Sequence, residues 1–600
     1  MNEKKFELAK AIECYKFGKI NEAKTKFEIL IRKYSKDKDI LYNYGVFLGE
    51  IEEYLLEQKI YKKIIKIDSK DIGALTNLSV SLNSTKNYNE AVFYATKALG
   101  INLNIPQAYE ARGLARINLA ELEDGLKDLK KWVELLLIKN GNTQVKLCLK
   151  SCIDLIDIPP IYKSSNEIKL VRDKIEKQID EVLKKLDRIA EEEINQENIG
   201  KKVAFKLNFF YLAYQQENDK KLNIKINRIL RKLLNISEKE NYPKYAYNKK
   251  QKLGIISTFQ FHPKVFIFDQ INAIDQSKYD IELIIINNSS FRINKLDDYK
   301  NEYLKLNAEN YEETTKYLNS KNFDVIFFPD IGMTFESRIL SLKKLANITV
   351  TSWLHPVTTG SPAIDYFLSG ELMEKNDAQN SYTEKLIKLP GIGLYIDPSD
   401  YISTSIDEIK DRKKSQRFRI GIIQTPFKIH PRMDNIMAEI GKRIPDAEFI
   451  FIELQKELDV KLISRIQDSF KKIGIDQRKI KLVKRMEINS YKKFLKDIDI
   501  SIDTLGWSGG NTTFDAFGAA LPVLTVEGDQ MRANHTAGMY KLLNLENYIS
   551  ICDEELIERA VNLSKDNHYL TDQKVQLLTN FSKIKTEKDI SNFFNQLKFI

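Results

Sequence analysis

A glycine-rich turn, Trp507 to Asp515, holds the residue types that bind a phosphate group. The apolar segment 499–504 precedes the turn, and a short helical stretch and a second apolar segment, 521–526, follow it. This pattern predicts a strand, a turn, a helix start and another strand. Glycine lets backbone approach a ligand closely, and a helix N-terminus offers unpaired N–H groups and a positive dipole. The alternative is a loop whose asparagine only caps the helix.

The turn divides into a predicted diphosphate site and a predicted sugar contact. Backbone, amide and hydroxyl donors come first, and a carboxylate that can hold a sugar hydroxyl stands one helical turn further on, at Asp515. The residues expected at the diphosphate are Gly509, Gly510, Asn511, Thr512 and Thr513.

A lysine follows another predicted strand in the same half of the chain. Lys428 closes the segment QTPFK, which begins with Gln424 and Thr425 and comes directly after the apolar run FRIGII. The carboxyl ends of parallel strands meet at one edge of a sheet, so we expect Lys428 beside the glycine-rich turn. There its ammonium group would neutralise a diphosphate. An ordinary surface lysine is the alternative.

Three of the five histidines precede proline and follow predicted strands. They are His262, His355 and His430. This recurrence at strand ends indicates that at least one of them acts in a site. His355 opens the loop HPVTTG, and we expect its later residues, Thr358, Thr359 and Gly360, to meet a sugar or an acceptor.

Two sets of alternating strands and helices must position these residues. Short β-rich runs separated by helical stretches occupy residues 249–402, and a second set begins at residue 403 and continues to residue 600. This rhythm predicts two doubly wound parallel sheets, a first lobe and a second lobe. Ligands of such sheets bind beyond the carboxyl ends of the strands, so the cleft between the lobes is the expected site.

The first quarter of the chain repeats every 34 residues. Small residues recur at Ala11, Gly45, Ser79 and Gly113, and a second set, Ala23, Glu57, Ala91 and Gly125, lies twelve residues further on. Small residues let two helices cross closely, so residues 1–140 are predicted to form about four units that resemble tetratricopeptide repeats. Such arrays form a groove for an extended peptide, and a plain helical spacer is the alternative. Residues 141–248 are a predicted helical connector.

The composition fits a globular protein and excludes several partners. The chain of 600 residues carries 94 Lys and Arg against 84 Asp and Glu, with lysine spread along helices, so no nucleic-acid partner is expected. No apolar run is long enough for a transmembrane helix, and the N-terminus lacks the apolar core of a secretion signal, so we expect a cytoplasmic location. The four cysteines are scattered and predict no metal site.

Together these motifs resemble the O-GlcNAc transferase and SPINDLY-like glycosyltransferases that carry tetratricopeptide repeats. The matching elements are His262-Pro, the HPVTTG loop with Ile364-Asp-Tyr, Tyr382-Thr-Glu-Lys-Leu, Gln424 to Lys428, and GGNTTFD. The HPVTT sequence also looks like that of the cytoplasmic N-glucosyltransferases. The resemblance implies a GT-B fold, a nucleotide-sugar donor, and inversion at the anomeric carbon without a metal or another cofactor.

The resemblance also implies a role for individual residues. Lys428 and the helix start at Asn511 would hold the diphosphate and stabilise the charge of the departing nucleotide. Asp515 would take the ribose, Tyr491 would stack on the base, and His262 would lie near the acceptor and the donor sugar.

Two positions depart from the animal enzymes of this family. Thr258 stands where they carry an aspartate, which excludes a carboxylate base at that position, and Asn511 stands where they carry a histidine. The general base is therefore open between His262, His355 and no side chain at all.

The leading prediction is a protein glycosyltransferase. The repeats would hold a polypeptide acceptor, and the two lobes would move a sugar from a UDP donor, first of all GlcNAc from UDP-GlcNAc to Ser or Thr. The alternative within this class is transfer of glucose from UDP-glucose to Asn. The alternative of another class is a non-catalytic repeat scaffold.

Overall fold

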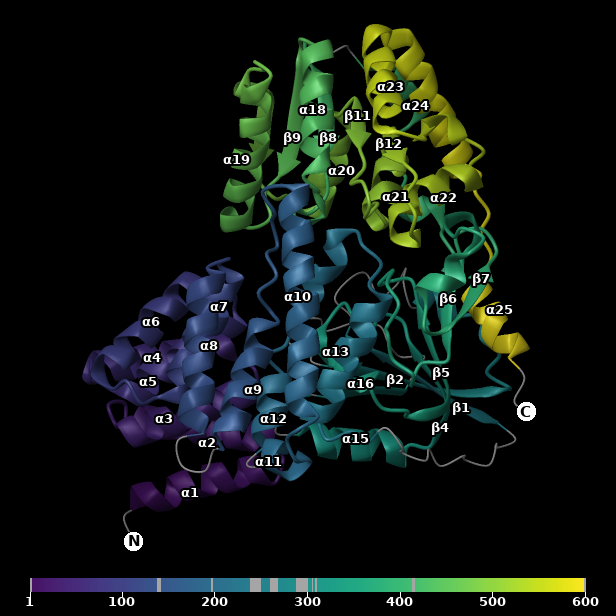
Figure 1. Cartoon of the computed structure of the whole chain (residues 1–600). Helices are drawn as coiled ribbons and strands as arrows, with labels where there is room; N and C mark the ends of the chain where they lie inside the picture. Colours follow the sequence, from purple (N-terminus) through teal and green to yellow (C-terminus); the bar gives the residue numbers. More distant parts are fainter. Residues whose placement is uncertain are drawn as a thin grey trace. The chain divides into compact units, whose positions relative to one another are not determined.

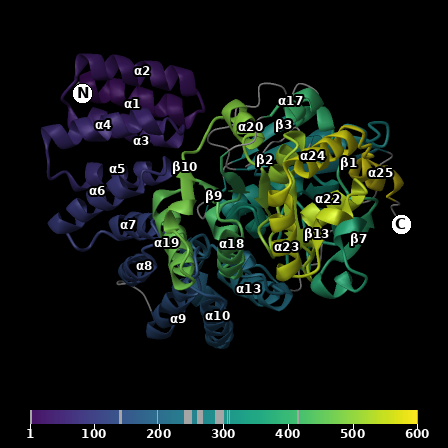
Figure 2. The same ribbon diagram turned by 90° about the horizontal axis from the view of Figure 1, so that it is seen from above.

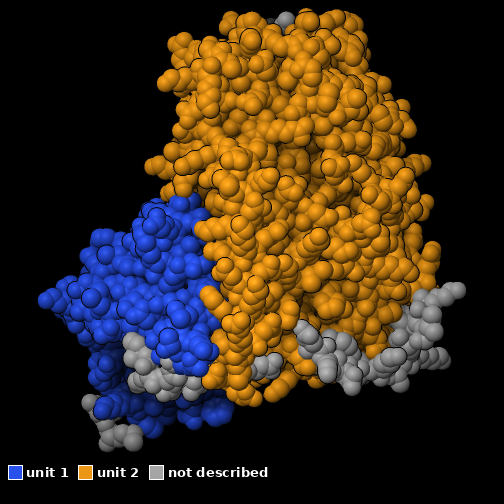
Figure 3. Space-filling model, viewed as in Figure 1, with its two compact units in different colours: residues 1–157 blue, residues 158–600 orange. Residues whose placement is uncertain are grey.

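The computed structural model describes the chain except for residues 1–2, 138–141, 196–197, 238–249, 259–267, 287–299, 305, 308–309, 413–415 and 598–600. Two units follow one another along the chain, residues 1–157 and residues 158–600, and Figure 3 shows them in different colours. Of the predicted site residues, His262 lies outside the described residues.

Paired helices make up the first unit, and Figure 2 shows them in succession. In the described part of the repeat region they are α1 (Glu3–Lys16), α2 (Ile20–Lys33), α3 (Lys38–Glu50), α4 (Tyr54–Ile67), α5 (Ile72–Ser84), α6 (Tyr88–Ile101), α7 (Pro106–Asn118) and α8 (Leu122–Leu136). Helix α9 (Thr143–Asp154) follows. The turns between them fall where the 34-residue period predicts them, so the predicted repeat array is confirmed.

Glycine at the repeated positions is required by close helix crossings. A Cβ atom added to Gly45 would lie 2.8 Å from the ring of Tyr61. A Cβ atom on Gly113 would lie 3.0 Å from the carbonyl oxygen of Gly125 in the partner helix. Larger side chains would therefore push the helices of these pairs apart.

Glu57 is the exception in the second set, and its surroundings explain why it fits. Its carboxylate is buried and accepts a hydrogen bond of 2.6 Å from the hydroxyl of Ser81. Gly49, on the facing helix, leaves room for this longer side chain, because a Cβ atom there would lie 2.8 Å from the carboxylate.

Helices of the predicted connector open the second unit and pack on the first lobe. They are α10 (Ser165–Leu186), α11 (Glu191–Asn195), α12 (Ile199–Ala204), the 3-10 helix η2 (Phe210–Gln215) and α13 (Lys220–Leu233). Two asparagines of α13, Asn223 and Asn227, donate to the carbonyl oxygens of Thr358 and Thr359, each at 2.9 Å. The connector therefore fixes a loop of the candidate site.

The first lobe contains a parallel sheet. Its described strands, in the order β3-β2-β1-β4-β5-β6-β7, are β3 (Lys300–Leu304), β2 (Tyr279–Ile286), β1 (Gln251–Ser257), β4 (Phe323–Phe328), β5 (Ala346–Ser352), β6 (Tyr366–Gly370) and β7 (Lys385–Leu389). The short helices α14 (Asp269–Ile271), α15 (Tyr311–Ser320) and α16 (Phe335–Leu340) lie between strands. All residues of β4 are buried, as expected for a strand covered on both faces.

The second lobe contains another parallel sheet. Its described strands, in the order β10-β9-β8-β11-β12-β13, are β10 (Ile480–Val483), β9 (Ala447–Ile452), β8 (Phe418–Ile422), β11 (Ile500–Ile502), β12 (Val523–Val526) and β13 (Ile549–Ser550), and Figure 1 shows β9, β8, β11 and β12 side by side. The connecting helices are α17 (Ile406–Asp411), α18 (Arg432–Arg443), α19 (Lys456–Lys472), α20 (Ile488–Lys496), α21 (Asn511–Gly518), α22 (His535–Leu542), α23 (Asp553–Lys565) and α24 (Asn567–Ser582).

The strand order of each sheet reverses direction once, between β1 and β4 and between β8 and β11. Loops that leave the carboxyl ends of two such strands diverge, and the crevice between them is the usual ligand site of doubly wound sheets. The loops after β8 and β11 carry Lys428 and the glycine-rich turn. The predicted fold class, a helical repeat array followed by two doubly wound parallel sheets, is confirmed.

The last helix, α25 (Asp589–Gln596), returns to the first lobe. The carbonyl oxygen of Phe594 accepts from the hydroxyl of Tyr279 at 2.8 Å, and Ser591 donates to the carbonyl oxygen of Gln270. The range 403–600, predicted as the second lobe, thus ends with a helix packed on the first. Among the described residues, no helix has the length and apolarity needed to cross a membrane.

Candidate active site

Asp503, the first residue after β11, organises the glycine-rich turn. One carboxylate oxygen accepts from the backbone N–H groups of Thr504 and Gly509, both at 2.9 Å. The other accepts from the hydroxyls of Ser508 at 2.5 Å and Thr525 at 2.9 Å. No sequence pattern singled out Asp503, although a carboxylate at the end of a buried strand, directly before a glycine-rich turn, was a usable signal.

The two predicted phosphate-binding loops meet beside the start of α21. Gln424 Nε2 donates to the hydroxyl oxygen of Thr512 at 2.5 Å, and Lys428 Nζ donates to Gln424 Oε1 at 3.2 Å. Gly509 makes this approach possible, because a Cβ atom there would lie 2.5 Å from Gln424 Nε2. The structure therefore brings Lys428 and the glycine-rich turn together, as the positions of their strands predict.

Lys428 is a half-buried cation at this crevice. Burial lowers its pKa to about 8, against the nearby charge of Asp503, which raises it. Within the described residues its ammonium group has a neutral amide oxygen as its hydrogen-bond partner, so its charge is available to an anionic ligand.

Two side chains predicted at the diphosphate bond instead to neighbouring residues. Asn511 accepts from the hydroxyl of Tyr401 at 3.0 Å and donates to Asp515 at 3.3 Å. The hydroxyl of Thr513 pairs with that of Thr536 at 3.0 Å. In this conformation the side chains of Asn511 and Thr513 stabilise the start of α21. The backbone of Gly510 and the hydroxyl of Thr512 remain at the N-terminus of α21 as the predicted diphosphate contacts.

Polar atoms at the predicted nucleotide end lack partners. The hydroxyls of Tyr491 and Thr425 are buried without a hydrogen-bond partner in the part of the chain that the structure describes. Burial raises the pKa of Asp515 to about 6, while Lys492 lowers it. Buried polar groups are nearly always paired in folded proteins, so these two hydroxyls are available to a ligand.

The first lobe contributes a carboxylate that the sequence did not reveal. Asp330, two residues after β4, accepts from the hydroxyl of Ser257 at 2.9 Å and from the backbone N–H and hydroxyl of Thr258 at 3.1 and 2.9 Å. These contacts involve Oδ2, and Oδ1 is buried without a partner. Burial raises the pKa of Asp330. A carboxylate thus stands beside position 258, although position 258 itself carries none.

His355 is buried at the edge of the cleft and is neutral. Burial, followed by the charges of Arg532 and Arg338, lowers its pKa to about 3. Its ring lies 5.7 Å from that of Trp507 in the second lobe, and its Nδ1 atom has no partner among the described residues. Gly332 is needed here, because a Cβ atom would collide with the imidazole.

Glu384 fixes the loop that contains Thr358, Thr359 and Gly360. It accepts from the hydroxyl of Thr358 at 2.7 Å, from the backbone N–H of Thr359 at 2.7 Å, and from the hydroxyl of Thr359. Gly360 has a φ of +69° and packs against Asn223. The hydroxyls of Thr358 and Thr359 are therefore hydrogen-bonded within the first lobe. The loop supports the candidate site, and in this conformation these hydroxyls are engaged by Glu384.

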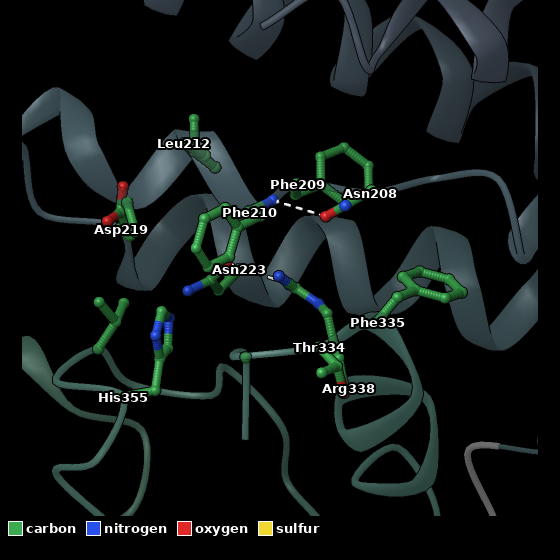
Figure 4. A pocket seen from close by; sticks show the side chains of 13 residues that line it. Asn208, Phe209, Phe210, Leu212, Asp219, Asn223, Thr334, Phe335, Arg338 and His355 are labelled. Atoms are coloured by element: carbon green, nitrogen blue, oxygen red, sulfur yellow. Dashed lines mark hydrogen bonds between the residues drawn. The ribbon is translucent and has the colours of Figure 1, made fainter. Parts of the chain in front are cut away.

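A pocket lies between the connector and the carboxyl end of the first sheet (Figure 4). His355 and Arg338 project into it from the first lobe, and Phe209 and Asn223 line it from the connector. Arg338 donates to the side-chain oxygens of Asn223 at 3.0 Å and Asn227 at 2.9 Å, so its guanidinium is held by neutral acceptors.

The remaining histidines differ in position. His430 accepts from the backbone N–H of Arg432 at 3.1 Å, which makes it a local cap before α18. His535, at the start of α22, was not predicted and is buried against Trp353 of the first lobe, with ring centroids 4.9 Å apart. Its position between two lobes depends on tertiary packing, which no motif around His535 reveals.

The fold and this site define a class of protein: a helical repeat array joined to a two-lobed GT-B unit with a glycine-rich loop at the crevice of its second sheet. A mutant of the Thermobaculum terrenum O-GlcNAc transferase has this fold, with a TM-score of 0.62, 16% identity, and coverage of 93% of this chain and 95% of that one. That likeness shows the fold.

Sequence comparison finds relatives but no family model that matches the chain. The chain is 24% identical over 239 residues to a Solanum lycopersicum protein named probable UDP-N-acetylglucosamine–peptide N-acetylglucosaminyltransferase SPINDLY. The aligned region covers 40% of this chain and 25% of that protein. It is 23% identical over 349 residues to an Arabidopsis thaliana protein that has the same enzyme name and is called SEC. This aligned region covers 55% of this chain and 34% of that protein.

The chain thus spans between a quarter and a third of the length of these curated relatives. The predicted resemblance to the O-GlcNAc transferase and SPINDLY-like family is confirmed.

Proposed function

We propose that this protein is a UDP-sugar-dependent glycosyltransferase that moves GlcNAc from UDP-GlcNAc to Ser or Thr of polypeptides. The observation that carries the proposal is the contact chain from Lys428 through Gln424 to Thr512, where the loops after β8 and β11 meet the N-terminus of α21. A half-buried cation, a glycine-rich turn and a helix N-terminus together form a site suited to a diphosphate. The names of the relatives supply the sugar and the acceptor class.

In the proposed reaction the acceptor oxygen attacks the anomeric carbon from the face opposite the diphosphate. The bond from that carbon to the β-phosphate oxygen breaks, UDP leaves with the electron pair, and the configuration inverts. Negative charge grows on the leaving diphosphate, where Lys428 and the start of α21 are preorganised to stabilise it. Asp515 and Tyr491 are proposed to hold the ribose and the base.

The proton of the acceptor hydroxyl needs a base, and three side chains are candidates. His355, with a pKa lowered to about 3 by burial and two arginines, is a weak base near neutral pH. Asp330 is a further candidate, because one of its oxygens is unpaired and burial raises its pKa. His262 remains a candidate from the resemblance.

The proposal includes catalysis without a metal ion. Its support is the positive charge of Lys428 and of the helix start beside the expected diphosphate. We expect EDTA to leave the initial rate of UDP release unchanged within about twofold, because Lys428 and the helix start would stabilise the leaving diphosphate in place of a metal ion. Loss of activity that Mg²⁺ or Mn²⁺ restores would contradict this part of the proposal.

A donor panel tests the proposed function. The purified protein is incubated with UDP-GlcNAc, UDP-glucose or other UDP-sugars and cellular proteins, and UDP release and the intact masses of the proteins are measured. We expect UDP-GlcNAc to give the fastest transfer, and Lys428→Ala to slow it at least about a hundredfold. Lys484→Ala, at an exposed lysine after β10, is the matched control.

The same panel separates the alternatives. If transfer is fastest from UDP-glucose and glucose is found on Asn, the proposed substrate is wrong. The protein is then an N-glucosyltransferase, the alternative that the HPVTT sequence suggests. Absence of UDP release with every donor, together with normal polypeptide binding, would identify a scaffold.

The repeat array is proposed to hold the acceptor polypeptide. Four apolar residues share one position of the 34-residue period on the first helix of each pair: Ile12, Val46, Val80 and Leu114. Val46 and Val80 are 41% and 47% exposed, which is unusual for valine inside a helix array. Repeated exposure of this kind suits contact with an extended chain. The cytoplasmic location and the lack of a nucleic-acid partner stay predictions.

A further inference from the structure

Two histidines and two tryptophans meet where the two lobes pack against each other. His355 of the first lobe lies 5.7 Å from Trp507 of the second, and His535 of the second lobe lies 4.9 Å from Trp353 of the first. Each histidine therefore reaches the other lobe. His355 belongs to the predicted site, whereas His535 has no role in the proposed function as described above.

The hydrogen bonds of His535 assign its tautomer. Its Nδ1 atom lies 3.3 Å from the carbonyl oxygen of Ser508, which can only accept, so Nδ1 carries the hydrogen. Burial, followed by the charge of Lys428, lowers the pKa of His535 to about 3, so the ring is neutral at physiological pH. The Nε2 atom is then a lone-pair acceptor.

This acceptor is buried and unused. His535 is 3% exposed, and Nε2 has no hydrogen-bond partner among the described residues. The ring cannot easily turn away, because Trp353 lies against it and Ser508 holds its other nitrogen. A fixed, buried acceptor without a donor indicates that a ligand supplies the donor.

The position of His535 indicates which part of the ligand it would contact. Ser508, which holds the ring, directly precedes Gly509 and Gly510 of the glycine-rich turn. Lys428, proposed to contact the diphosphate, is close enough to affect the titration of His535. In a UDP-sugar the group bonded to the β-phosphate is the sugar, whose hydroxyls are hydrogen-bond donors.

We propose that His535 Nε2 accepts a hydrogen bond from a hydroxyl of the donor sugar and thereby helps to select the sugar. The inference rests on the proposed function, because it assumes a UDP-sugar in the cleft. His535 is then a specificity residue that contacts the sugar, whereas Lys428 and the helix start recognise the nucleotide part, common to all donors.

Binding measurements separate this role from simple support of the glycine-rich turn. Dissociation constants of UDP and of UDP-GlcNAc are measured by calorimetry for the full chain and for His535→Phe, which keeps a ring against Trp353 but has no nitrogen. We expect the variant to lose about tenfold in affinity for UDP-GlcNAc, the size of one buried hydrogen bond, and less than twofold for UDP. His535→Gln, which keeps an acceptor, should recover most of the loss.

Equal losses for UDP and UDP-GlcNAc would show that His535 only supports Ser508, and no loss for either ligand would also overturn the inference. His568→Phe is the control, because that histidine is 89% exposed. If the unaltered protein binds another UDP-sugar but not UDP-GlcNAc, the proposed substrate is wrong. The affinities of the unaltered protein and of His535→Phe are then compared for that UDP-sugar and for UDP. Failure to bind any UDP-sugar would overturn the proposed function and this inference with it.

A second measurement begins with the unaltered protein. Donor analogues that each lack one sugar hydroxyl are tested for binding to it. We expect one of them to bind about tenfold more weakly than the parent, and His535→Phe, which has no acceptor, to bind that analogue and the parent with a smaller ratio. If every analogue binds the unaltered protein within twofold of the parent, no hydroxyl is recognised and the inference is wrong.

Discussion

Lys428 meets two opposing demands at the scale of a single residue. Its proposed role requires a positive charge beside the diphosphate, but burial disfavours that charge and lowers its pKa to about 8. Gln424 offers it one neutral oxygen, and Asp503 offers charge without a hydrogen bond among the described residues. A bound diphosphate would supply the missing negative charge and raise the pKa again, so binding and protonation are coupled.

This coupling predicts a pH dependence of nucleotide affinity. The pKa of Lys428 in the free protein lies below its ordinary value, so the charged form is lost as the pH rises through about 8. We expect the affinity for UDP to be constant between about pH 7 and 8 and then to fall about tenfold per pH unit until the pKa of the complex is reached. Calorimetric titrations at a series of pH values measure it.

Lys428→Arg provides the matched control for the pH dependence. A guanidinium group keeps its proton throughout this range, so the break near pH 8 should disappear even if the overall affinity is lower. Constant affinity of the unaltered protein up to pH 9.5, or the same break in the arginine variant, would show that another group controls binding.

At the scale of elements, the connector braces the glycine-rich turn. Asp219, at the end of the segment between η2 and α13, accepts from Arg172 of α10 at 2.9 Å and from Arg532 of the second lobe at 2.8 Å. The carbonyl oxygen of Arg532 in turn accepts from the backbone N–H of Ser508 at 2.7 Å. Tyr214 of η2 packs on Trp507, with ring centroids 4.2 Å apart. A connector thus helps to shape a site in the second lobe.

Asp219→Asn tests this brace. The change removes the carboxylate that two buried guanidinium groups share, so we expect the second unit to lose about 3–5 kcal/mol of stability, the usual cost of breaking a buried ion pair. The affinity for UDP should also fall, because the turn loses its anchor. Urea unfolding followed by tryptophan fluorescence measures the first effect and calorimetry the second.

Asp187→Asn is the control for this prediction, since Asp187 pairs with Arg228 at the surface, where ion pairs contribute little. A similar shift in both variants, or none in Asp219→Asn, would mean that the buried charges do not hold the connector to the second lobe.

At the scale of the whole molecule, regular patterns were predictable and particular contacts were not. The 34-residue period and the alternation of strands and helices depend on spacing, so the array and both sheets followed from the sequence. Lys428 was placed beside the glycine-rich turn because the ends of parallel strands meet at one edge. Asp330 and His535 were missed, and Glu384 was named only within the motif Tyr382-Thr-Glu-Lys-Leu without a role, since the roles of all three depend on which loops fold against one another.

Asn511 shows the same limit in a residue that was predicted. Its place at a helix start after two glycines favoured a phosphate contact, and the structure shows its amide bonded to Tyr401 and Asp515. Tyr401 is 110 residues away in the sequence, so no local pattern contains this competitor for the amide.

The proposed division of labour between the two units gives a prediction for the whole protein. If the first unit holds the polypeptide and the second performs the chemistry, a change on the repeat helices should affect only polypeptide substrates. We expect the double variant Val46→Asp and Val80→Asp to modify cellular proteins about tenfold more slowly, because two carboxylates on an apolar contact surface must lose water when a chain binds. The affinity for UDP-GlcNAc should not change. Leu55→Asp, on the second helix of its pair and 70% exposed, is the control and should have little effect. An unchanged rate in the double variant, with the fold intact by circular dichroism, would place the acceptor on another surface of the protein.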